Sequence, residues 1–290
     1  MKVLIIGGEG QLGTVLNNLT SSQTFASFDI TTIELLDLSQ EDNIRIFFAG
    51  KKYDFVVNCS AYTAVDKAET DRDTAFLLNA LAPGWIGKYA AQMHAGVIHV
   101  STDYVFDGTA NTPLTPEMPV NPVSQYGKSK LEGELHLMAE NPDSIIIRTA
   151  WLYSPYGQNF MKTMLRLASE RDELNVVFDQ VGSPTSATDL ATAIMRILQM
   201  ASENRESFIP GVYHYANEGV CSWYDFAIMI FKLAGISCKV NAVRTDAYPT
   251  PARRPAYSVM DKHKIKEQFG LTIPYWVDSL EAVIENYQPN

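Results

Sequence analysis

The stretch MKVLIIGGEGQLG, residues 1–13, decides the fold class. It opens on a short apolar run, typical of a buried parallel strand, and continues into a turn with glycines at positions 7, 10 and 13. Such a turn, followed by a helix whose first amides point at phosphates, predicts a dinucleotide site. The residues expected to contact the dinucleotide here are Gly7, Gly10, Gln11, Leu12 and Gly13.

The identity of the dinucleotide is harder to predict. The second strand is expected near Phe28–Ile33, and a charge at its end would distinguish NADH from NADPH, an acid for ribose hydroxyls or a base for a 2′-phosphate. The sequence there reads ITTIE, and Glu34 lies beyond the expected strand end. Both cofactors, NADPH or NADH, therefore stay open. Asp37 and Leu38 are expected on the adenine side, although Asp37 could equally begin a helix.

The composition excludes several classes of protein. The chain has 290 residues, of which 46% are hydrophobic, enough for one large domain with a smaller lobe. Its net charge of -10 and pI near 5.0 argue against nucleic acid or an anionic membrane as a partner. No run reaches the ~18 apolar residues of a membrane helix. The three widely spaced cysteines fit reduced thiols, so we expect a cytoplasmic protein.

Apolar, β-branched runs alternate with helix-like segments through the first half of the chain. This alternation predicts an α/β protein with a Rossmann-like, doubly wound parallel sheet. In such sheets ligands bind at the carboxyl ends of the strands. The runs are Val3–Ile6, Phe55–Asn58, Val97–Ser101 and Ile145–Arg148.

The pattern becomes irregular beyond Trp151 and predicts a smaller, discontinuous α/β lobe for the substrate. A helix near 188–201 is expected to return to the first domain, whereas a strand near 212–215 is expected in the second lobe. The predicted domains are 1–150 with about 186–206 for the dinucleotide, and about 151–185 with 207–290 for the substrate.

Small and polar residues follow the run that ends at Asn58. Ser60, Ala61 and Tyr62 lie where a cofactor could rest against the strand end, and Asn79 lies in a following helix. A buried helical asparagine usually makes a structural hydrogen bond, so Asn79 either supports the cofactor site or serves the fold alone.

Tyr126 and Lys130 form a candidate acid and base. Four residues apart on a helix they share one face, so an ammonium can sit near a phenol. A phenol pKa of about 10 is too high for proton transfer at neutral pH, and a nearby cation lowers it. The hydroxyl-rich segment Ser101–Tyr104 directly follows an apolar run and precedes this pair.

With the glycine turn, the Ser101–Tyr104 segment and the Tyr126/Lys130 pair in this order, the chain resembles the extended short-chain dehydrogenases/reductases over essentially its whole length. Finer strings narrow the resemblance to the dTDP-4-dehydrorhamnose reductases, which catalyse the last step of dTDP-L-rhamnose synthesis. These strings are Ser60–Glu69, Ser101–Gly108, Arg148–Tyr153 and Arg253–Pro255.

The resemblance implies reduction of the C4 ketone of dTDP-4-dehydro-L-rhamnose by NADPH or NADH. Tyr126 would supply the proton, Thr102 would hold the carbonyl oxygen, and Lys130 would stabilise the phenolate and bind the nicotinamide ribose. Asp103 is followed by Tyr104, not by the second carboxylate of related dehydratases, so elimination of water is not expected. Alternatives are another nucleotide-sugar reductase or epimerase, and a non-catalytic cofactor-binding subunit, since one known relative regulates a methionine adenosyltransferase.

The implied dTDP-sugar carries a negatively charged pyrophosphate, which needs a local basic pocket in a chain of net charge -10. Arg253 and Arg254, flanked by prolines, suit bidentate phosphate contacts. The further residues expected to contact the substrate are Thr102, Asp103, Tyr104 and Trp151.

The residue that binds metal in some members of the family is different in this chain. Some relatives hold magnesium at a dimer interface with a glutamate two positions after the third glycine, and Val15 occupies that position here. An apolar side chain cannot ligate a hard cation. We therefore expect no metal requirement, and a homodimer stays open.

Overall fold

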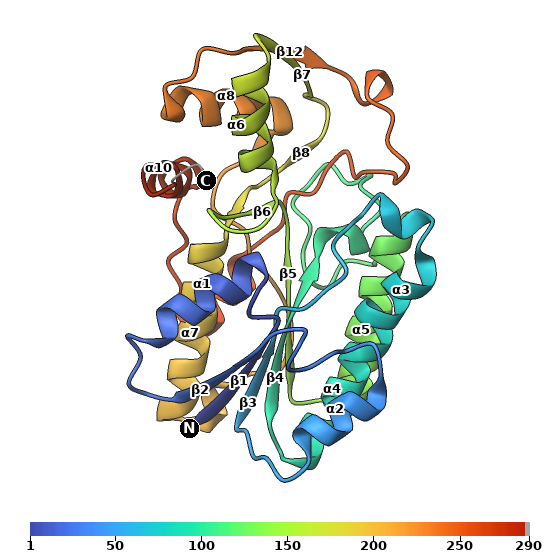
Figure 1. Cartoon of the computed structure of the whole chain (residues 1–290), viewed down its shortest axis with the longest axis vertical. Helices are drawn as coiled ribbons and strands as arrows, with labels where there is room; N and C mark the ends of the chain where they lie inside the picture. The colour runs from blue at the N-terminus through green and yellow to red at the C-terminus, as the bar shows by residue number, and fades with distance from the viewer. Residues whose placement is uncertain (288–290) are drawn as a thin grey trace.

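A six-stranded parallel sheet forms the centre of the larger lobe in the computed structural model, which describes residues 1–287 (Figure 1). The strand order is β10-β5-β4-β3-β1-β2, and all neighbours pair in parallel. The doubly wound parallel sheet predicted from the sequence is confirmed. Its strands are β1 (Lys2–Ile6), β2 (Ser27–Thr31), β3 (Phe55–Asn58), β4 (Gly96–Thr102), β5 (Ser144–Thr149) and β10 (Gly211–His214).

The order of the strands reverses between β1 and β3. From β1 the chain first adds β2 on one side and then β3, β4 and β5 on the other. Ligands of open α/β sheets bind at such a switch point, outside the carboxyl ends of the strands. Here that point lies beside Gly7, after β1, and Cys59–Ser60, after β3.

Helices cover both faces of the sheet, which explains why the strands are continuously apolar (Figure 1). Along β1, Val3 and Ile5 enter one hydrophobic core, and Leu4 and Ile6 enter the other. The first core packs against α1 (Gln11–Thr20), α7 (Ala187–Glu203) and α9 (His263–Phe269). The second packs against α2 (Glu41–Phe48), α4 (Ala82–Gln92) and α5 (Gln125–Glu140).

The predicted place of the strand near 212–215 was wrong. This segment is β10, which pairs with β5 in the large sheet, Tyr213 opposite Ile147. The Tyr213 side chain is buried in the same core as Phe269 of α9. A short apolar run predicts a strand but not the sheet that it joins, because both lobes can bury it equally well.

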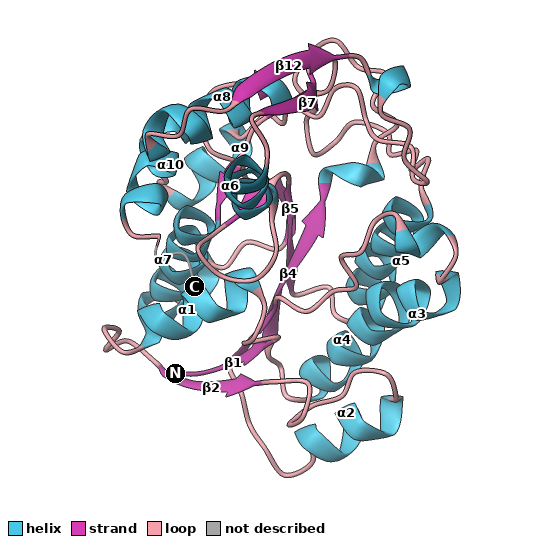
Figure 2. Cartoon of the chain, turned by 45° about the horizontal axis from the view of Figure 1, so that its top comes forward, coloured by secondary structure: helices cyan, strands magenta, loops and turns pink. Residues whose placement is uncertain are grey.

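The smaller lobe has its own hydrophobic core, built around Phe226 and Trp276. Figure 2 shows its paired strands β7 and β12 at the end of the molecule opposite α2. Its elements are α6 (Phe160–Glu170), β7 (Glu173–Val177), α8 (Trp223–Ala234), β12 (Lys239–Val243) and α10 (Trp276–Glu285). Two-residue strands link the lobes: β6 (Leu152–Tyr153), β8 (Val181–Gly182), β9 (Thr185–Ser186) and β11 (Cys221–Ser222).

Short helical turns complete the described chain. They are η1 (Lys67–Glu69), α3 (Arg72–Phe76), the π-helical turn η2 (Leu77–Leu81), η3 (Asp103–Val105), η4 (Arg205–Ser207) and η5 (Thr245–Ala247). Within residues 1–287, no helix has the length and apolar character needed to span a membrane.

Candidate active site

The glycine turn joins β1 to α1 through close backbone contacts. Gly7 has a φ of +84°, and a Cβ on Gly13 would lie 2.0 Å from the Gly7 carbonyl oxygen. Gly10 is the N-cap of α1 and makes no side-chain cap, and a Cβ there would meet only the Gly7 oxygen, at 3.4 Å. The first amides of α1, those of Gln11 and Leu12 included, lie at a helix N-terminus next to glycines, which is the kind of place where phosphates bind.

The Gln11 side chain, unlike its backbone amide, contacts the smaller lobe. Its Oε1 accepts hydrogen bonds from Ser154 Oγ at 3.0 Å and from Asn159 Nδ2 at 2.9 Å. Asn159 is the N-cap of α6, so these bonds hold the start of α1 against the smaller lobe.

Asp37 and Leu38, both expected on the adenine side of the cofactor, differ in exposure. The Asp37 carboxylate accepts hydrogen bonds from the Ser39 amide at 2.8 Å and the Ser39 hydroxyl at 2.9 Å, forming an exposed turn before α2. The Leu38 side chain is buried in a hydrophobic core, and its contact with the cofactor stays a prediction. β2 ends at Thr31, whose carbonyl accepts from the Gly8 amide at 2.8 Å.

Ser60–Tyr62 lie against the glycine turn, where Ser60 N is 2.8 Å from the position of a Cβ on Gly7. Asn79 is completely buried in η2 and fixes this segment. Its Oδ1 accepts from the Tyr62 amide at 2.8 Å, and its Nδ2 donates to the Tyr62 carbonyl at 3.0 Å and to Ser129 Oγ at 3.1 Å. The Asn79 side chain therefore shapes the loop, and its own polar atoms are occupied.

Thr102 and Asp103 lie at the carboxyl end of β4. Thr102 Oγ1 donates to Asp103 Oδ1 at 3.1 Å and accepts from the Tyr104 amide at 3.2 Å. Asp103 is buried, and its Oδ2 has no hydrogen-bond partner in the described part of the chain. Burial raises the pKa of Asp103 to about 6.

Tyr126 lies in the first turn of α5, where Ser124 caps the helix by accepting from the Gly127 amide at 3.1 Å. Its ring is buried and packs edge-on against Tyr104, with centroids 5.5 Å apart. Burial raises the pKa of Tyr126, and a hydrogen bond with Thr102 acts in the opposite direction. The phenol therefore keeps its proton at neutral pH, as a proton donor requires.

Lys130 does not act on Tyr126 in the way predicted from the helical spacing. Its Nζ donates to the Val100 carbonyl at 2.8 Å and lies 3.4 Å from His99 Nε2. Burial lowers the pKa of Lys130 to about 8. The expectation that its ammonium lowers the phenol pKa is therefore wrong for this structure, because the side chain points beneath the strand end toward β4.

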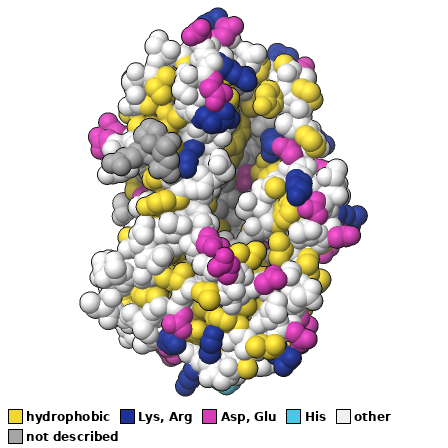
Figure 3. Space-filling view, in the orientation of Figure 1, with side chains coloured by type: hydrophobic (Ala, Val, Ile, Leu, Met, Phe, Trp, Pro, Cys, Tyr) yellow, Lys and Arg dark blue, Asp and Glu magenta, His cyan; other side chains and the backbone are white. Residues whose placement is uncertain are grey.

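The two arginines predicted to bind phosphate differ in position. Arg254 donates to Tyr104 Oη at 3.0 Å and to Asp66 Oδ2 at 2.6 Å, and its side chain is 25% exposed. Arg253 is exposed. Figure 3 shows the surface hollowed between the two lobes. Arg254 thus connects the smaller lobe's loop to Tyr104, which packs on Tyr126.

Trp151 has an unusual backbone conformation for a bulky residue, with a φ of +50°. Its indole stacks on Trp223 of α8 at a centroid distance of 3.6 Å and lies against Gly182. Because strained backbone conformations concentrate at functional sites, this conformation supports the expected contact of Trp151 with the substrate.

Four further residues around this site were not predicted: Asn58, Asp66, His99 and Glu134. Glu134 forms a buried salt bridge with Arg148 at 2.7 Å, and it follows Lys130 by four residues, a spacing that the sequence does show. Asp66 pairs with a residue 188 positions away, and no local pattern indicates such a contact.

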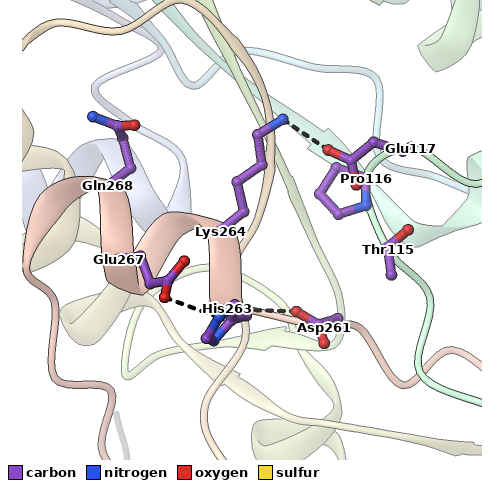
Figure 4. A pocket seen from close by; sticks show the side chains of 8 residues that line it. All are labelled: Thr115, Pro116, Glu117, Asp261, His263, Lys264, Glu267 and Gln268. Carbon is purple, nitrogen blue, oxygen red and sulfur yellow. Dashed lines mark hydrogen bonds and ion pairs between the residues drawn. The ribbon is translucent and has the colours of Figure 1, made fainter.

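A cavity of about 630 Å³ lies elsewhere, beside α9 (Figure 4). Its walls come from Thr115–Glu117, Asp261 and α9, and Lys264 of α9 donates to Glu117 at 2.9 Å. None of the predicted site residues lines it. The loop 111–122, which holds four prolines, therefore contributes to this cavity.

Comparisons with known proteins agree along the whole chain. The RmlD substrate binding domain model matches residues 1–289. The dTDP-4-dehydrorhamnose reductase of Sinorhizobium fredii is 39% identical over 98% of this chain and 97% of its own. The reductase of the same name from Escherichia coli K12 is also 39% identical, over 95% of this chain and 94% of its own.

Solved structures of similarly named proteins have the same fold. A dTDP-4-dehydrorhamnose reductase from Clostridium acetobutylicum matches with a TM-score of 0.92 and 42% identity, covering 98% of this chain and 99% of that one. A Bacillus anthracis dTDP-4-dehydrorhamnose reductase, solved in complex with NADP, matches with a TM-score of 0.90 and 34% identity, covering 98% of both chains. This chain belongs to the family that the RmlD substrate binding domain model describes, the dTDP-4-dehydrorhamnose reductases.

Proposed function

We propose that this protein reduces the C4 ketone of dTDP-4-dehydro-L-rhamnose to give dTDP-L-rhamnose, using NADPH or NADH. The observation that carries the proposal is the protonated, buried Tyr126 beside Thr102 at the carboxyl end of β4. Reduction of a ketone needs a hydride and one proton. The sequence offers a proton donor here but no second carboxylate after Asp103, which favours reduction over elimination of water.

The glycine turn and the segment 60–62 fit a dinucleotide, because Gly10 leaves space in front of the first amides of α1. The nicotinamide supplies the hydride when the cofactor is bound. The Bacillus anthracis relative binds NADP. In this chain no charged side chain ends β2, and the exposed turn after Thr31 supports use of either cofactor.

The chain's own residues would handle the proton and the carbonyl. Tyr126 would donate its phenolic proton to the ketone oxygen, and Thr102 would hold the same oxygen through its hydroxyl. Lys130, buried one turn beyond Tyr126, would bind the nicotinamide ribose. These three roles are transferred from the family to the matching positions of this sequence.

The substrate would lie between the lobes. Arg254 uses some of its five N–H donors on Asp66 and Tyr104, and the remaining donors suit the dTDP pyrophosphate. Asp103 and Tyr104 would contact the sugar beside Thr102, and Trp151 would do so from the other lobe. We extend the proposal to a first domain for the dinucleotide and a second for the nucleotide-sugar, with β10 and α9 now assigned to the first.

Two aspects of the setting stay predictions. The thiols of Cys59, Cys221 and Cys238 are free, which supports a reducing compartment such as the cytoplasm. A homodimer is tested by size-exclusion chromatography with light scattering, which would give about twice the 32.3 kDa mass of the chain.

The proposed reaction is tested by mixing the protein, NADPH or NADH, and dTDP-4-dehydro-L-rhamnose. We expect the cofactor absorbance to fall and the product to be dTDP-L-rhamnose by NMR. Oxidation of the cofactor with the talose epimer as product would instead assign another reductase stereochemistry. No oxidation, with the cofactor still bound, would favour a regulatory subunit over an enzyme.

A further inference from the structure

A buried row of polar groups leads from the Ser60 amide to Lys130. Ser60 N donates to Asn58 Oδ1 at 3.0 Å, and Asn58 Nδ2 lies 3.1 Å from His99 Nδ1. On the other side of the imidazole, His99 Nε2 lies 3.4 Å from Lys130 Nζ, which donates to the Val100 carbonyl at 2.8 Å. Asn58, His99 and Lys130 are each at most 1% exposed.

The first member of the row fixes the direction of the others. A backbone amide only donates, so the Asn58 carbonyl oxygen faces Ser60 and its NH₂ group faces His99. His99 Nδ1 must then accept, and a neutral imidazole carries its proton on Nε2, which faces Lys130. An ammonium cannot accept a hydrogen bond, whereas a neutral amine can.

Among the groups around Lys130, Glu134 favours the ammonium, but burial has the larger effect and lowers the pKa of Lys130. From α5, Glu134 lies one turn beyond Lys130, but its carboxylate is bound by Arg148 of β5 and by Ser101 of β4. From the end of β3, Cys59 keeps its proton, because burial raises the pKa of its thiol to about 12. Tyr126, on the same helix, is likewise neutral, since burial raises its pKa.

We propose that His99, oriented by Asn58, stabilises the neutral amine form of Lys130 in the cofactor-free protein, and that cofactor binding favours the ammonium, so that the protein takes up protons from solvent when it binds cofactor at mildly alkaline pH. His99 is thus a positioning residue that acts through Lys130. The reason for this uptake is the negative charge of the cofactor phosphates, which favours the charged form of a nearby amine. The part of the proposal that concerns cofactor binding, the cofactor half, rests on the proposed function. The part that concerns the cofactor-free protein, the cofactor-free half, does not.

The cofactor-free half is tested by nitrogen-15 NMR of the histidine side chains. We expect His99 to carry a proton on Nε2 and none on Nδ1. His214 is an internal reference with the other tautomer. Its Nδ1 lies 3.0 Å from the Leu114 carbonyl oxygen, so Nδ1 must carry the proton. A proton on His99 Nδ1 in the unaltered chain would overturn the proposal.

Asn58→Asp reverses the hydrogen bond between residue 58 and His99 with little change in side-chain shape. A carboxylate accepts from both Ser60 N and His99, so we expect Nδ1 of His99 to become protonated in this variant. Asn141→Asp is the matched control, because Asn141 is also buried but donates to the carbonyl of Ala95, which lies just before β4, whereas Lys130 contacts Val100 near the other end of that strand. An unprotonated Nδ1 in folded Asn58→Asp, or a changed His99 in Asn141→Asp, would contradict the assigned row.

The cofactor half is tested by calorimetry of NADPH binding at pH 8.5 in buffers of different ionisation enthalpy. We expect uptake of about half to one proton per bound NADPH, since the cofactor's own phosphate titrates only near pH 6. In Asn58→Asp the uptake should fall toward zero, because Lys130 is already charged. Binding without proton uptake in the parent chain would overturn this half. Absence of NADPH binding would overturn the proposed function as well, while the NMR result would stand by itself.

Discussion

The glycine turn and the buried cluster of Thr102, Asp103, Tyr126 and Lys130 lie at the same edge of the sheet but work by opposite physical means. The turn works through missing side chains, because a Cβ on Gly13 would lie 2.0 Å from a backbone oxygen. The cluster works through side chains whose protonation is set by burial. Substitutions in the turn should therefore change binding, and substitutions in the cluster should change turnover and pH dependence.

The largest effect is expected in the cluster, for Tyr126→Phe. Removal of the proton donor should lower kcat by about 10²–10⁴, while cofactor affinity stays within a small factor of the parent. Steady-state kinetics and NADPH titration measure the two quantities. Tyr89→Phe is the control, since Tyr89 bonds Glu41 away from the site. Retained turnover in Tyr126→Phe would remove Tyr126 from the proposed mechanism.

The turn is tested by comparing Gly10→Ala with Gly13→Ala. Gly13→Ala places a methyl group against backbone, so the free energy of unfolding should fall by about 1–3 kcal/mol. Gly10→Ala has room in the protein alone and should unfold like the parent, yet bind NADPH at least about tenfold more weakly, because the phosphates approach there. Denaturation and NADPH titration separate the effects. Parent-like affinity in Gly10→Ala would show that the phosphates lie elsewhere.

Arg254→Ala tests whether the loop of the smaller lobe binds the substrate and not the cofactor. Loss of charge-assisted hydrogen bonds should raise the KM for the dTDP-sugar about tenfold with cofactor affinity unchanged. Arg253→Ala should raise KM less, since its side chain is more exposed. Arg166→Ala, which removes an exposed ion pair with Glu170 within α6, is the control. An unchanged KM in both Arg253→Ala and Arg254→Ala would refute the phosphate assignment.

Asp103→Asn tests whether burial sets the charges of the cluster. The pKa of Asp103 is about 6, against 3.8 for an ordinary aspartate, so its ionisation destabilises the folded chain as the pH rises through that interval. The stability of Asp103→Asn relative to the parent should therefore increase by roughly 1–3 kcal/mol between pH 4 and pH 8. Urea denaturation at both pH values measures it. A difference that does not change with pH would contradict the shift.

The smallest effect is expected from removal of divalent cations. Val15 is buried in the core of the larger lobe and has no oxygen to offer a metal. Activity after EDTA treatment should match the untreated protein within error. Loss of activity that magnesium restores would show that other residues hold a metal.

The comparison also explains what the sequence could predict. The turn is formed by neighbours in sequence, so its glycines and the strand before it could be identified directly. The Tyr126/Lys130 spacing was equally visible, but the direction of the Lys130 side chain depends on Val100 and His99 of another strand. Long-range packing of this kind leaves no local pattern.

In the smaller lobe, too, long-range contacts could not be predicted from the sequence. Arg253 and Arg254 were identified as the charged pair of their loop, but the partner of Arg254, Asp66, lies in the other lobe. The apolar run at β10 predicted a strand, and only its pairing with β5 showed which sheet it completes. Cofactor choice stayed open because β2 ends at Thr31 and neither Thr31 nor the next residue, Thr32, carries a charge.

Direct hydride transfer is the central claim, and NADPH carrying deuterium at the transferable C4 position of its nicotinamide tests it most directly. The protein would be mixed with this cofactor and dTDP-4-dehydro-L-rhamnose, and the sugar product analysed by NMR and mass spectrometry. We predict one deuterium at C4 of dTDP-L-rhamnose, formed by the parent chain and far more slowly by Tyr126→Phe. A product without deuterium, or equal rates for both chains, would contradict the account.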